Sequence, residues 1–184
     1  FHKFPLTRKQ PLVNVPLETT VLAQDFDFVL GKPRKIASTD GNVTEFLYDG
    51  FGRPTKVWDS LGSEALPATT YNYGWGAEPN TITATYRTGP GTSDTVSQLH
   101  CFDGFGRKVE AVAPYTATQW SVSGEVLIDN RGLTKKAFVP RTTSAEGCSQ
   151  PVLSNDGTSY TYDALARPTS IVQPGTGQPT TTKQ

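Results

Sequence analysis

The sequence predicts an all-β fold, an antiparallel meander of short hairpins, and three observations lead to this prediction. Fourteen prolines and seventeen glycines interrupt the 184 residues at short intervals. Between the interruptions, apolar residues alternate with polar ones, which is the period of a strand with one covered face. A short motif built on an aspartate and a glycine recurs along the chain. No segment shows the longer apolar periodicity of a dependable helix.

The alternating segments are expected to form the strands. The clearest runs place an apolar side chain at every second residue: Phe46 and Tyr48; Tyr71, Tyr73 and Trp75; Ile82, Ala84 and Tyr86; Trp120, Val122, Val126 and Ile128. Polar residues fill the intervening positions, as at Ser121, Ser123 and Glu125. One face of the sheet is therefore expected to pack, and the other to meet solvent or a lumen.

The recurring motif predicts a strand, a tight turn and a second strand. Its positions in the five copies are Phe26, Asp27 and Gly31; Tyr48, Asp49, Gly52 and Arg53; Phe102, Asp103, Gly106 and Arg107; Asp129 and Gly132; Tyr162, Asp163 and Arg167. The aromatic residue ends a strand, the aspartate can accept hydrogen bonds from the turn, and glycine permits positive φ. These residues are predicted to be structural and not catalytic.

The five copies are unevenly spaced and differ in detail. The uneven spacing implies longer hairpins between some of them. Leu133 replaces the arginine in the fourth copy, Ala166 replaces the glycine in the fifth, and the first copy has one more residue before Gly31. These turns are expected to differ in type. A second turn signal, such as Asp59-Ser60-Leu61-Gly62, closes each unit.

The pattern Tyr-Asp-x-x-Gly-Arg, followed by a short strand and a second turn, resembles the YD repeats of Rhs proteins, teneurins and the B and C components of insecticidal toxin complexes. The resemblance covers residues 25–184, and the block from Tyr48 to Leu133 is most similar to the B component. In that family the repeats coil into a spiral β-sheet that closes into a hollow shell around a toxic C-terminal segment. The resemblance implies a wall segment of a secreted or cell-surface virulence protein.

The same resemblance divides the chain into two parts. Residues 1–24 lie outside the motif and are rich in proline, so we expect a leading irregular or extended segment. Residues 25–184 are expected to form the YD-repeat β-sheet. Because the chain contains no Met, we expect an internal portion of a longer chain or a processed product. Its expected partners are flanking YD repeats of the same chain or a companion toxin-complex subunit.

Charge and hydropathy argue against two kinds of partner. Lys+Arg and Asp+Glu are equal at 17 each, and no basic cluster is longer than a pair such as Lys135-Lys136, so no nucleic-acid partner is expected. No apolar run approaches the roughly 20 residues that cross a bilayer, so no membrane span is expected. No motif implies a cofactor.

Two residue pairs raise the question of catalysis, and a structural interpretation is preferred for both. His100 and Cys101 are adjacent, so on a strand they point to opposite faces and cannot form a Cys–His pair. Asp25 and Asp27 fall on one side of a strand and would suit a hydrolase, but solvated strand carboxylates are commoner. The self-cleaving core and toxic tail of the family have no counterpart here, so we do not expect an enzyme.

Metal and dinucleotide sites receive even less support. His2 is the only histidine besides His100, which leaves a histidine-based zinc site short of ligands. Asp40-Gly41-Asn42 offers oxygen ligands but lacks the rest of a calcium-binding loop. The two Gly-Phe-Gly segments do not continue to a third glycine at the dinucleotide-binding spacing, so they are expected to be turns.

The cysteines and one aromatic row leave alternatives open. Cys101 and Cys148 are too few for a disulfide scaffold. Two unpaired thiols are the simpler expectation, with a bridge as the alternative. Tyr71, Tyr73 and Trp75 could stack on sugar rings, which makes glycans a further candidate partner, although core packing is the commoner use of such residues. An adhesive, glycan-binding YD-repeat module is thus the alternative to a shell.

Overall fold

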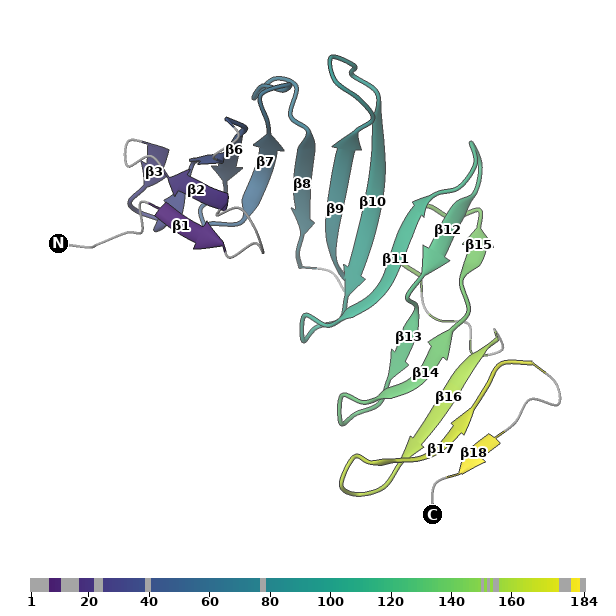
Figure 1. The fold of residues 1–184 in the computed structure, drawn as a ribbon. Helices are drawn as coiled ribbons and strands as arrows, with labels where there is room; N and C mark the ends of the chain where they lie inside the picture. The colour runs from purple at the N-terminus through teal and green to yellow at the C-terminus, as the bar shows by residue number, and fades with distance from the viewer. Residues whose placement is uncertain are drawn as a thin grey trace. The chain divides into compact units, whose positions relative to one another are not determined.

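The computed structural model shows an all-β protein. It describes residues 7–10, 17–21, 25–38, 41–76, 79–149, 151, 153, 156–175 and 180–182. These residues form 18 β-strands and no α-helix (Figure 1). None of them belongs to a helix with the length and hydrophobicity that a membrane crossing requires. Neighbouring strands run antiparallel wherever their register is defined. The fold class predicted from the sequence is confirmed.

The chain divides into two compact units, one formed by residues 1–72 and 84–96, the other by residues 73–83 and 97–184. The strands of the first half of the chain are β1 Thr7–Gln10, β2 Leu17–Val21, β3 Phe26–Asp27, β4 Lys32–Pro33, β5 Lys35–Ser38, β6 Val43–Tyr48, β7 Pro54–Trp58, β8 Thr69–Gly74 and β9 Asn80–Arg87. Those of the second half are β10 Thr95–Phe102, β11 Lys108–Pro114, β12 Trp120–Ser123, β13 Val126–Ile128, β14 Thr134–Phe138, β15 Arg141–Thr143, β16 Gly157–Tyr162, β17 Pro168–Val172 and β18 Thr180–Thr182.

The strands from β1 to β10 form a meander. They pair in the order β1-β2-β5-β6-β7-β8-β9-β10, and β3 and β4 form a separate two-stranded ribbon. Sequential pairing is what short turns between consecutive strands produce. Strands β1 and β2 lie within the predicted leading segment 1–24. The other residues of that segment lie outside the described residues.

The second unit contains two groups of paired strands. One runs β8-β9-β10-β11-β12-β15, and the other is a five-stranded sheet, β13-β14-β16-β17-β18, in the lower part of Figure 1. The chain therefore leaves the first group after β12, forms the hairpin β13–β14, and returns as β15.

This crossover corrects the expectation of one strand over residues 120–128. Gly124 takes a φ of 63° and breaks the extended run between β12 and β13. The break turns Glu125 inward, so that only 2% of this residue is exposed. A carboxylate predicted on a wet face is therefore buried, and Arg141 is the partner that makes this burial tolerable.

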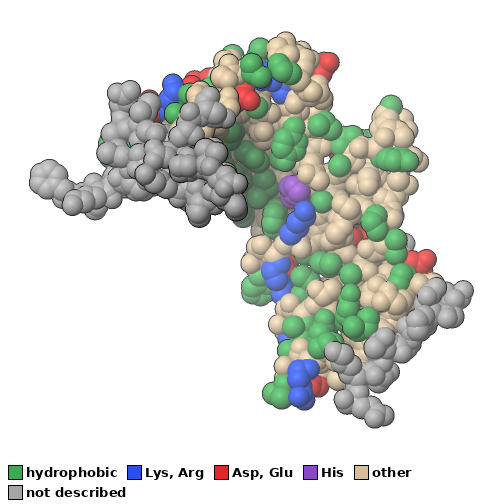
Figure 2. All heavy atoms as spheres, in the orientation of Figure 1, with side chains coloured by type: hydrophobic (Ala, Val, Ile, Leu, Met, Phe, Trp, Pro, Cys, Tyr) green, Lys and Arg blue, Asp and Glu red, His purple; other side chains and the backbone are tan. Residues whose placement is uncertain are grey.

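The apolar core of the second unit is small. Cys101, Val112 and Val122 are buried together, and Leu99, Val109, Trp120 and Cys148 pack against them. Most other strand residues are half-buried, and Figure 2 shows hydrophobic side chains among polar ones on the surface over β13 and β14. The backbone ladders and turns therefore contribute a large share of what holds these sheets together.

We predict that the isolated chain self-associates through sheet edges. Strand β15 ends one strand order and β18 ends another, so no described strand pairs with the outer edge of either. Sedimentation velocity at several concentrations should show species larger than a monomer. Thr142→Lys places a charge at an exposed position of β15 and should reduce the association. A folded monomer at every concentration would contradict this prediction.

Candidate functional sites: the aspartate turns and a disulfide–carboxylate cluster

Four hairpins share one turn geometry. They are β6–β7, β10–β11, β13–β14 and β16–β17, and in each the register shifts just before the last residue of the first strand. That last residue then faces the residue six positions later, as Phe102 faces Lys108. The backbone N–H three residues after the aspartate donates to the aspartate carbonyl. This combination is a tight β-turn followed by a bulge.

The aspartate side chain closes each of these turns. In the third copy, Asp103 Oδ1 accepts hydrogen bonds from the backbone N–H groups of Phe105 at 3.0 Å and Arg107 at 2.9 Å. Asp49, Asp129 and Asp163 accept the same two bonds, all at 2.9 Å. A carboxylate that bonds its own turn fixes the reversal, because it satisfies N–H groups that the strand ladder cannot reach.

The motif arginine binds the other carboxylate oxygen. Arg107 Nε lies 2.6 Å from Asp103 Oδ2, and Arg53 Nε lies 2.7 Å from Asp49 Oδ2. Each of these guanidinium groups also lies over the aromatic ring of its turn, 5.2 Å from the Phe51 centroid and 5.1 Å from the Phe105 centroid. In the fifth copy Leu165 replaces the ring, and the Arg167 side chain is 73% exposed against 37% for Arg107.

In two copies a different arginine binds the motif aspartate. In the fourth copy Arg131, two positions after Asp129, supplies the guanidinium with a longer Nε–Oδ2 distance of 3.4 Å. In the first copy the extra residue changes the turn, so that Asp27 accepts from Val29 and Leu30, and Arg34 supplies the ion pair. The fifth copy keeps the standard turn, but Ala166 holds the left-handed conformation, with a φ of 62°.

Within each unit, neighbouring turns touch. In the second unit Arg131 Nη1 donates to the carbonyl of Asp163 at 2.8 Å. The guanidinium of Arg107 lies so close to Gly132 that a Cβ at this position would meet it at 2.6 Å. In the first unit Lys32 Nζ donates to the carbonyl of Gly52. Successive copies are therefore joined side by side at their turns.

The motif tyrosines make a second connection between strands. Tyr48 donates its hydroxyl hydrogen to the carbonyl of Pro33 at 2.8 Å, and Tyr162 donates to the carbonyl of Thr134 at 2.9 Å. Each ring stacks on the aromatic residue two positions earlier on its strand, at centroid distances of 6.1 Å for Tyr48 and 6.5 Å for Tyr162. The two copies thus hold equivalent places on their sheets.

The environment of the motif aspartates favours the ionised form. At Asp163 the backbone and side-chain hydrogen bonds from Arg167 lower the pKa below the ordinary value of 3.8. At Asp103 desolvation raises the pKa, but the bonds from Arg107 and Phe105 outweigh it and the pKa is again lowered. Stability from such groups is present above the ordinary pKa and is lost as the pH falls through the lowered one.

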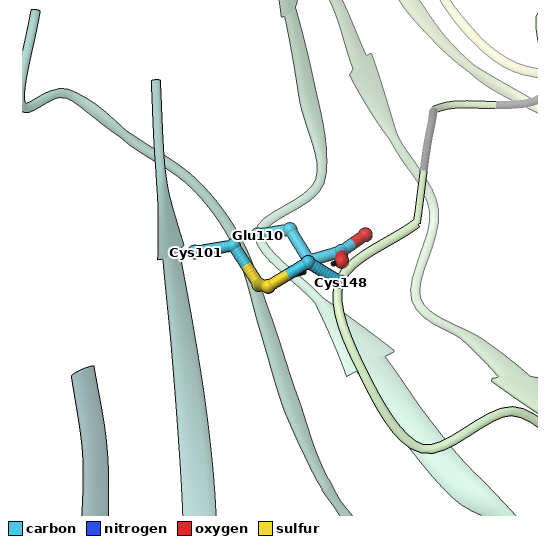
Figure 3. A group of neighbouring side chains, drawn as sticks. All are labelled: Cys101, Glu110 and Cys148. Atoms are coloured by element: carbon cyan, nitrogen blue, oxygen red, sulfur yellow. Dashed lines mark hydrogen bonds between the residues drawn. A yellow bond between two sulfur atoms is a disulfide. The ribbon is translucent and has the colours of Figure 1, made fainter. Parts of the chain in front are cut away.

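Cys101 and Cys148 form a disulfide, which corrects the simpler expectation of two unpaired thiols. Their Cα atoms lie 6.0 Å apart and 47 residues separate them in the sequence. The bond joins strand β10 to the loop that follows β15 (Figure 3). In a chain-entropy treatment, closing a loop of this length stabilises the fold by roughly 4 kcal/mol. Sequence spacing could not decide the pairing, because only the fold brings the two residues together.

A buried glutamate, Glu110, lies against the disulfide, and a second, Glu125, is linked to it through Arg141 and Ser149. Glu110 accepts a hydrogen bond from the backbone N–H of Ser149 at 2.7 Å, and Glu125 binds Arg141 through two bonds of 3.0 Å. Arg141 also donates to Ser149 Oγ at 2.8 Å, which links the two carboxylates. We call Cys101, Glu110, Glu125, Arg141, Cys148 and Ser149 the disulfide–carboxylate cluster. A lone Glu between apolar residues of β11 was the signal that could have indicated it.

The two carboxylates of the cluster differ in their electrostatics. Desolvation raises the pKa of Glu110, the Ser149 N–H opposes this rise, and the negative charge of Glu125 adds to it. Glu125 instead has a bidentate guanidinium partner. A cavity of about 220 Å³ adjoins Glu110 and the disulfide, with Val126, Leu127 and Ile128 on its wall.

The other residues that the sequence suggested for catalytic, metal or glycan sites do not form those catalytic pairs among the described residues. Cys101 is oxidised, so it cannot act as a nucleophile with His100. The carboxylate of Asp27 is bound by its own turn and by Arg34, which leaves no free pair with Asp25. Asp40 of the candidate calcium loop lies outside the described residues. Tyr71 and Tyr73 lie on β8, and Trp75, just beyond it, is 59% exposed.

We predict that Asp103→Ala destabilises the protein. The change removes three side-chain hydrogen bonds and leaves the N–H groups of Phe105 and Arg107 without their acceptor. The midpoint of thermal unfolding should fall by about 2–4 °C. Asp94→Ala is the control, because the Asp94 side chain accepts no hydrogen bond from any described residue, and it should leave the midpoint unchanged. Equal midpoints for the two variants would refute a structural role.

We also predict that Ala166→Gly is more stable than Ala164→Gly. Ala166 has a φ of 62°, where its Cβ is sterically strained, whereas Ala164 in the same turn does not have positive φ. Both changes raise the conformational entropy of the unfolded chain by the same amount, so the difference in stability between the two variants isolates the backbone strain at Ala166. Denaturant unfolding should place the Ala166→Gly variant about 1–2 kcal/mol above the other. Indistinguishable variants would mean that the turn relaxes.

The fold resembles that of solved structures of TcdB2-TccC3. The crystal structure of TcdB2-TccC3 matches 85% of this chain with a TM-score of 0.68 and 15% sequence identity. A second crystal structure, TcdB2-TccC3 without the hypervariable C-terminal region, matches 84% with a TM-score of 0.63 and 13% identity. The present chain spans only 10% and 13% of those two chains. No family model and no curated protein matches the sequence. The chain thus shares its fold with a small part of TcdB2-TccC3.

Proposed function

We propose that this chain is a non-enzymatic structural segment of an Rhs/YD-repeat protein. In this proposal it forms part of the wall of a hollow β-shell that encapsulates a toxic C-terminal cargo and helps to deliver it. The observation that carries the proposal is the repetition of one aspartate turn at four hairpins, with the same bonds and the same bulge. Repetition of a structural unit along a sheet is how a wall is extended.

The resemblance to TcdB2-TccC3 supports this proposal at the level of fold. One of the two structures is of TcdB2-TccC3 without its hypervariable C-terminal region, so that protein carries a variable segment at its C-terminal end. The match runs over most of the present chain, so it includes hairpins of both units. A segment with this fold is suited to a wall, because its consecutive strands pair laterally and each hairpin adds width to the sheet.

The environment of the acidic residues supports a role without catalysis. In the motif aspartates, one carboxylate oxygen accepts hydrogen bonds from the turn, and the other binds a guanidinium group. A general base needs a carboxylate that can reach a substrate proton. Asp27, which together with Asp25 would suggest a hydrolase from the sequence, is likewise bound by its own turn and by Arg34, so it is better explained as a turn-closing group.

The proposal assigns partners and a location. The partners are flanking YD repeats of the same chain, or a companion toxin-complex subunit, that continue the strand orders at β15 and β18. The location is outside the producing cell, in a secreted or cell-surface protein, as the YD-repeat resemblance implies.

Electron cryomicroscopy of the longer protein that contains this segment tests the proposal. The expected result is a closed, hollow β-structure in which residues 25–184 form part of the wall and contact flanking repeats on both sides. Protease treatment should then cleave an enclosed C-terminal segment only after the shell is opened. A segment that stands apart from any shell as an independent module would contradict the proposal.

Exposed aromatic side chains favour a second candidate, a glycan-binding module. Phe51 and Phe105 are each 87% exposed at turn tips, and Trp75 is 59% exposed. Such rings can stack on sugars. A glycan array with the wild-type chain and with Trp75→Ala tests this candidate. Binding that disappears in the variant would favour adhesion over the shell, and absence of binding would leave the shell as the only candidate.

A further inference from the structure

We propose that reduction of the Cys101–Cys148 disulfide creates a metal site of two thiolates and the Glu110 carboxylate, suited to Zn²⁺. The two sulfur atoms and a Glu110 oxygen all lie within 4.8 Å of one another, in the arrangement that Figure 3 shows. These ligands come from β10, β11 and the loop after β15, so the fold and not a local sequence motif brings them together. The site is independent of the proposed shell function.

The distances suit tetrahedral coordination. Zn–S and Zn–O bonds of about 2.3 Å and 2.1 Å at a tetrahedral angle place sulfur and oxygen about 3.6 Å apart. Cys101 Sγ lies 3.6 Å from Glu110 Oε1. In the disulfide this sulfur carries no hydrogen, so the approach is a contact of two prospective ligand atoms and not a hydrogen bond. The two sulfur atoms must separate to about 3.8 Å for both to bind one ion.

The surroundings favour a cation once the disulfide is open. Glu110 is 2% exposed, and its only donor among the described residues is Ser149, whose backbone N–H binds Oε1 and whose hydroxyl binds Oε2. Oε1 can keep the N–H bond on one lone pair and bind metal with the other. Arg141 and Arg107 are nearby positive charges, and the ion pairs that they form with Glu125 and Asp103 neutralise them. The adjoining cavity of about 220 Å³ has room for a water molecule as the fourth ligand.

The chemistry balances with a named reductant. A water-soluble phosphine and one water molecule reduce the disulfide to two thiols, and the phosphine becomes its oxide. Zn²⁺ then displaces one proton from each thiol, so metal binding releases two protons and strengthens as the pH rises. In an oxidising compartment the disulfide blocks the site, and in a reducing compartment the thiols are available to metal.

The test uses the phosphine-reduced chain with Co²⁺ as a spectroscopic probe and Zn²⁺ as the competitor. The expected result is a near-ultraviolet cobalt–thiolate band that saturates at one equivalent and disappears on addition of Zn²⁺. The unreduced protein should show no band. Absence of the band from the reduced protein would overturn the proposal.

Two variants separate the carboxylate from the thiols. Glu110→Gln should weaken Zn²⁺ binding at least about tenfold in competition with a chromogenic chelator. Glu146→Gln, an exposed carboxylate two residues from Cys148, is the matched control and should bind as the wild type does. The double change of Cys101→Ser and Cys148→Ser should abolish binding. Equal affinity of the Glu110→Gln and wild-type proteins would overturn the assignment of Glu110.

Reduction can also unfold the chain, and thermal unfolding with Zn²⁺ tests the proposal in that case. The disulfide closes a long loop, so its reduction lowers stability. Zn²⁺ at the proposed site binds only the folded chain and should restore a cooperative thermal transition at a higher temperature. If Zn²⁺ does not raise the unfolding temperature of the reduced wild type above that of the double serine variant, the proposal is wrong.

Discussion

The hydrogen bonds from the turn N–H groups to the motif aspartate are the interaction on which the rest of the structure depends. Each carboxylate holds two backbone N–H groups that the strand ladder leaves unpaired, and its arginine neutralises it without removing it from the turn. The hairpin register follows from this closed turn, because a slip of one residue would reverse every side chain. With so few residues fully buried, a fixed register compensates for a small core.

The motif made the turns predictable from the sequence. Its aspartate, glycine and aromatic residue carry local chemistry, so their spacing indicated the hairpins before any tertiary contact was known. The first copy shows the limit of this reasoning, because its extra residue moved the ion pair to Arg34, which lies outside the motif. The apparent strand over 120–128 fails for a similar reason. Period-two alternation does not reveal that Gly124 turns the chain between two sheets.

The disulfide–carboxylate cluster could not be predicted because its members are remote in the sequence. Ser149 reaches Glu110 across 39 residues, and Arg141 reaches Glu125 across 16. Composition gave no reason to expect buried carboxylates, since charged residues are rarely buried without a partner. The crossover from β12 through β13 and β14 to β15 supplies these partners. The same crossover brings Cys148 to Cys101, so one topological feature explains the disulfide, the ion pair and the candidate metal site.

Amide hydrogen exchange tests most directly the claim that the aspartates hold the turns. The N–H of Arg107 donates to Asp103, whereas the N–H of Gly104 in the same turn donates to no described group. The account predicts that Arg107 exchanges much more slowly than Gly104, and that the same contrast recurs between Arg167 and Ala164. Equally fast exchange at Arg107 and Gly104 would show that the carboxylate does not hold the turn, and would contradict the account.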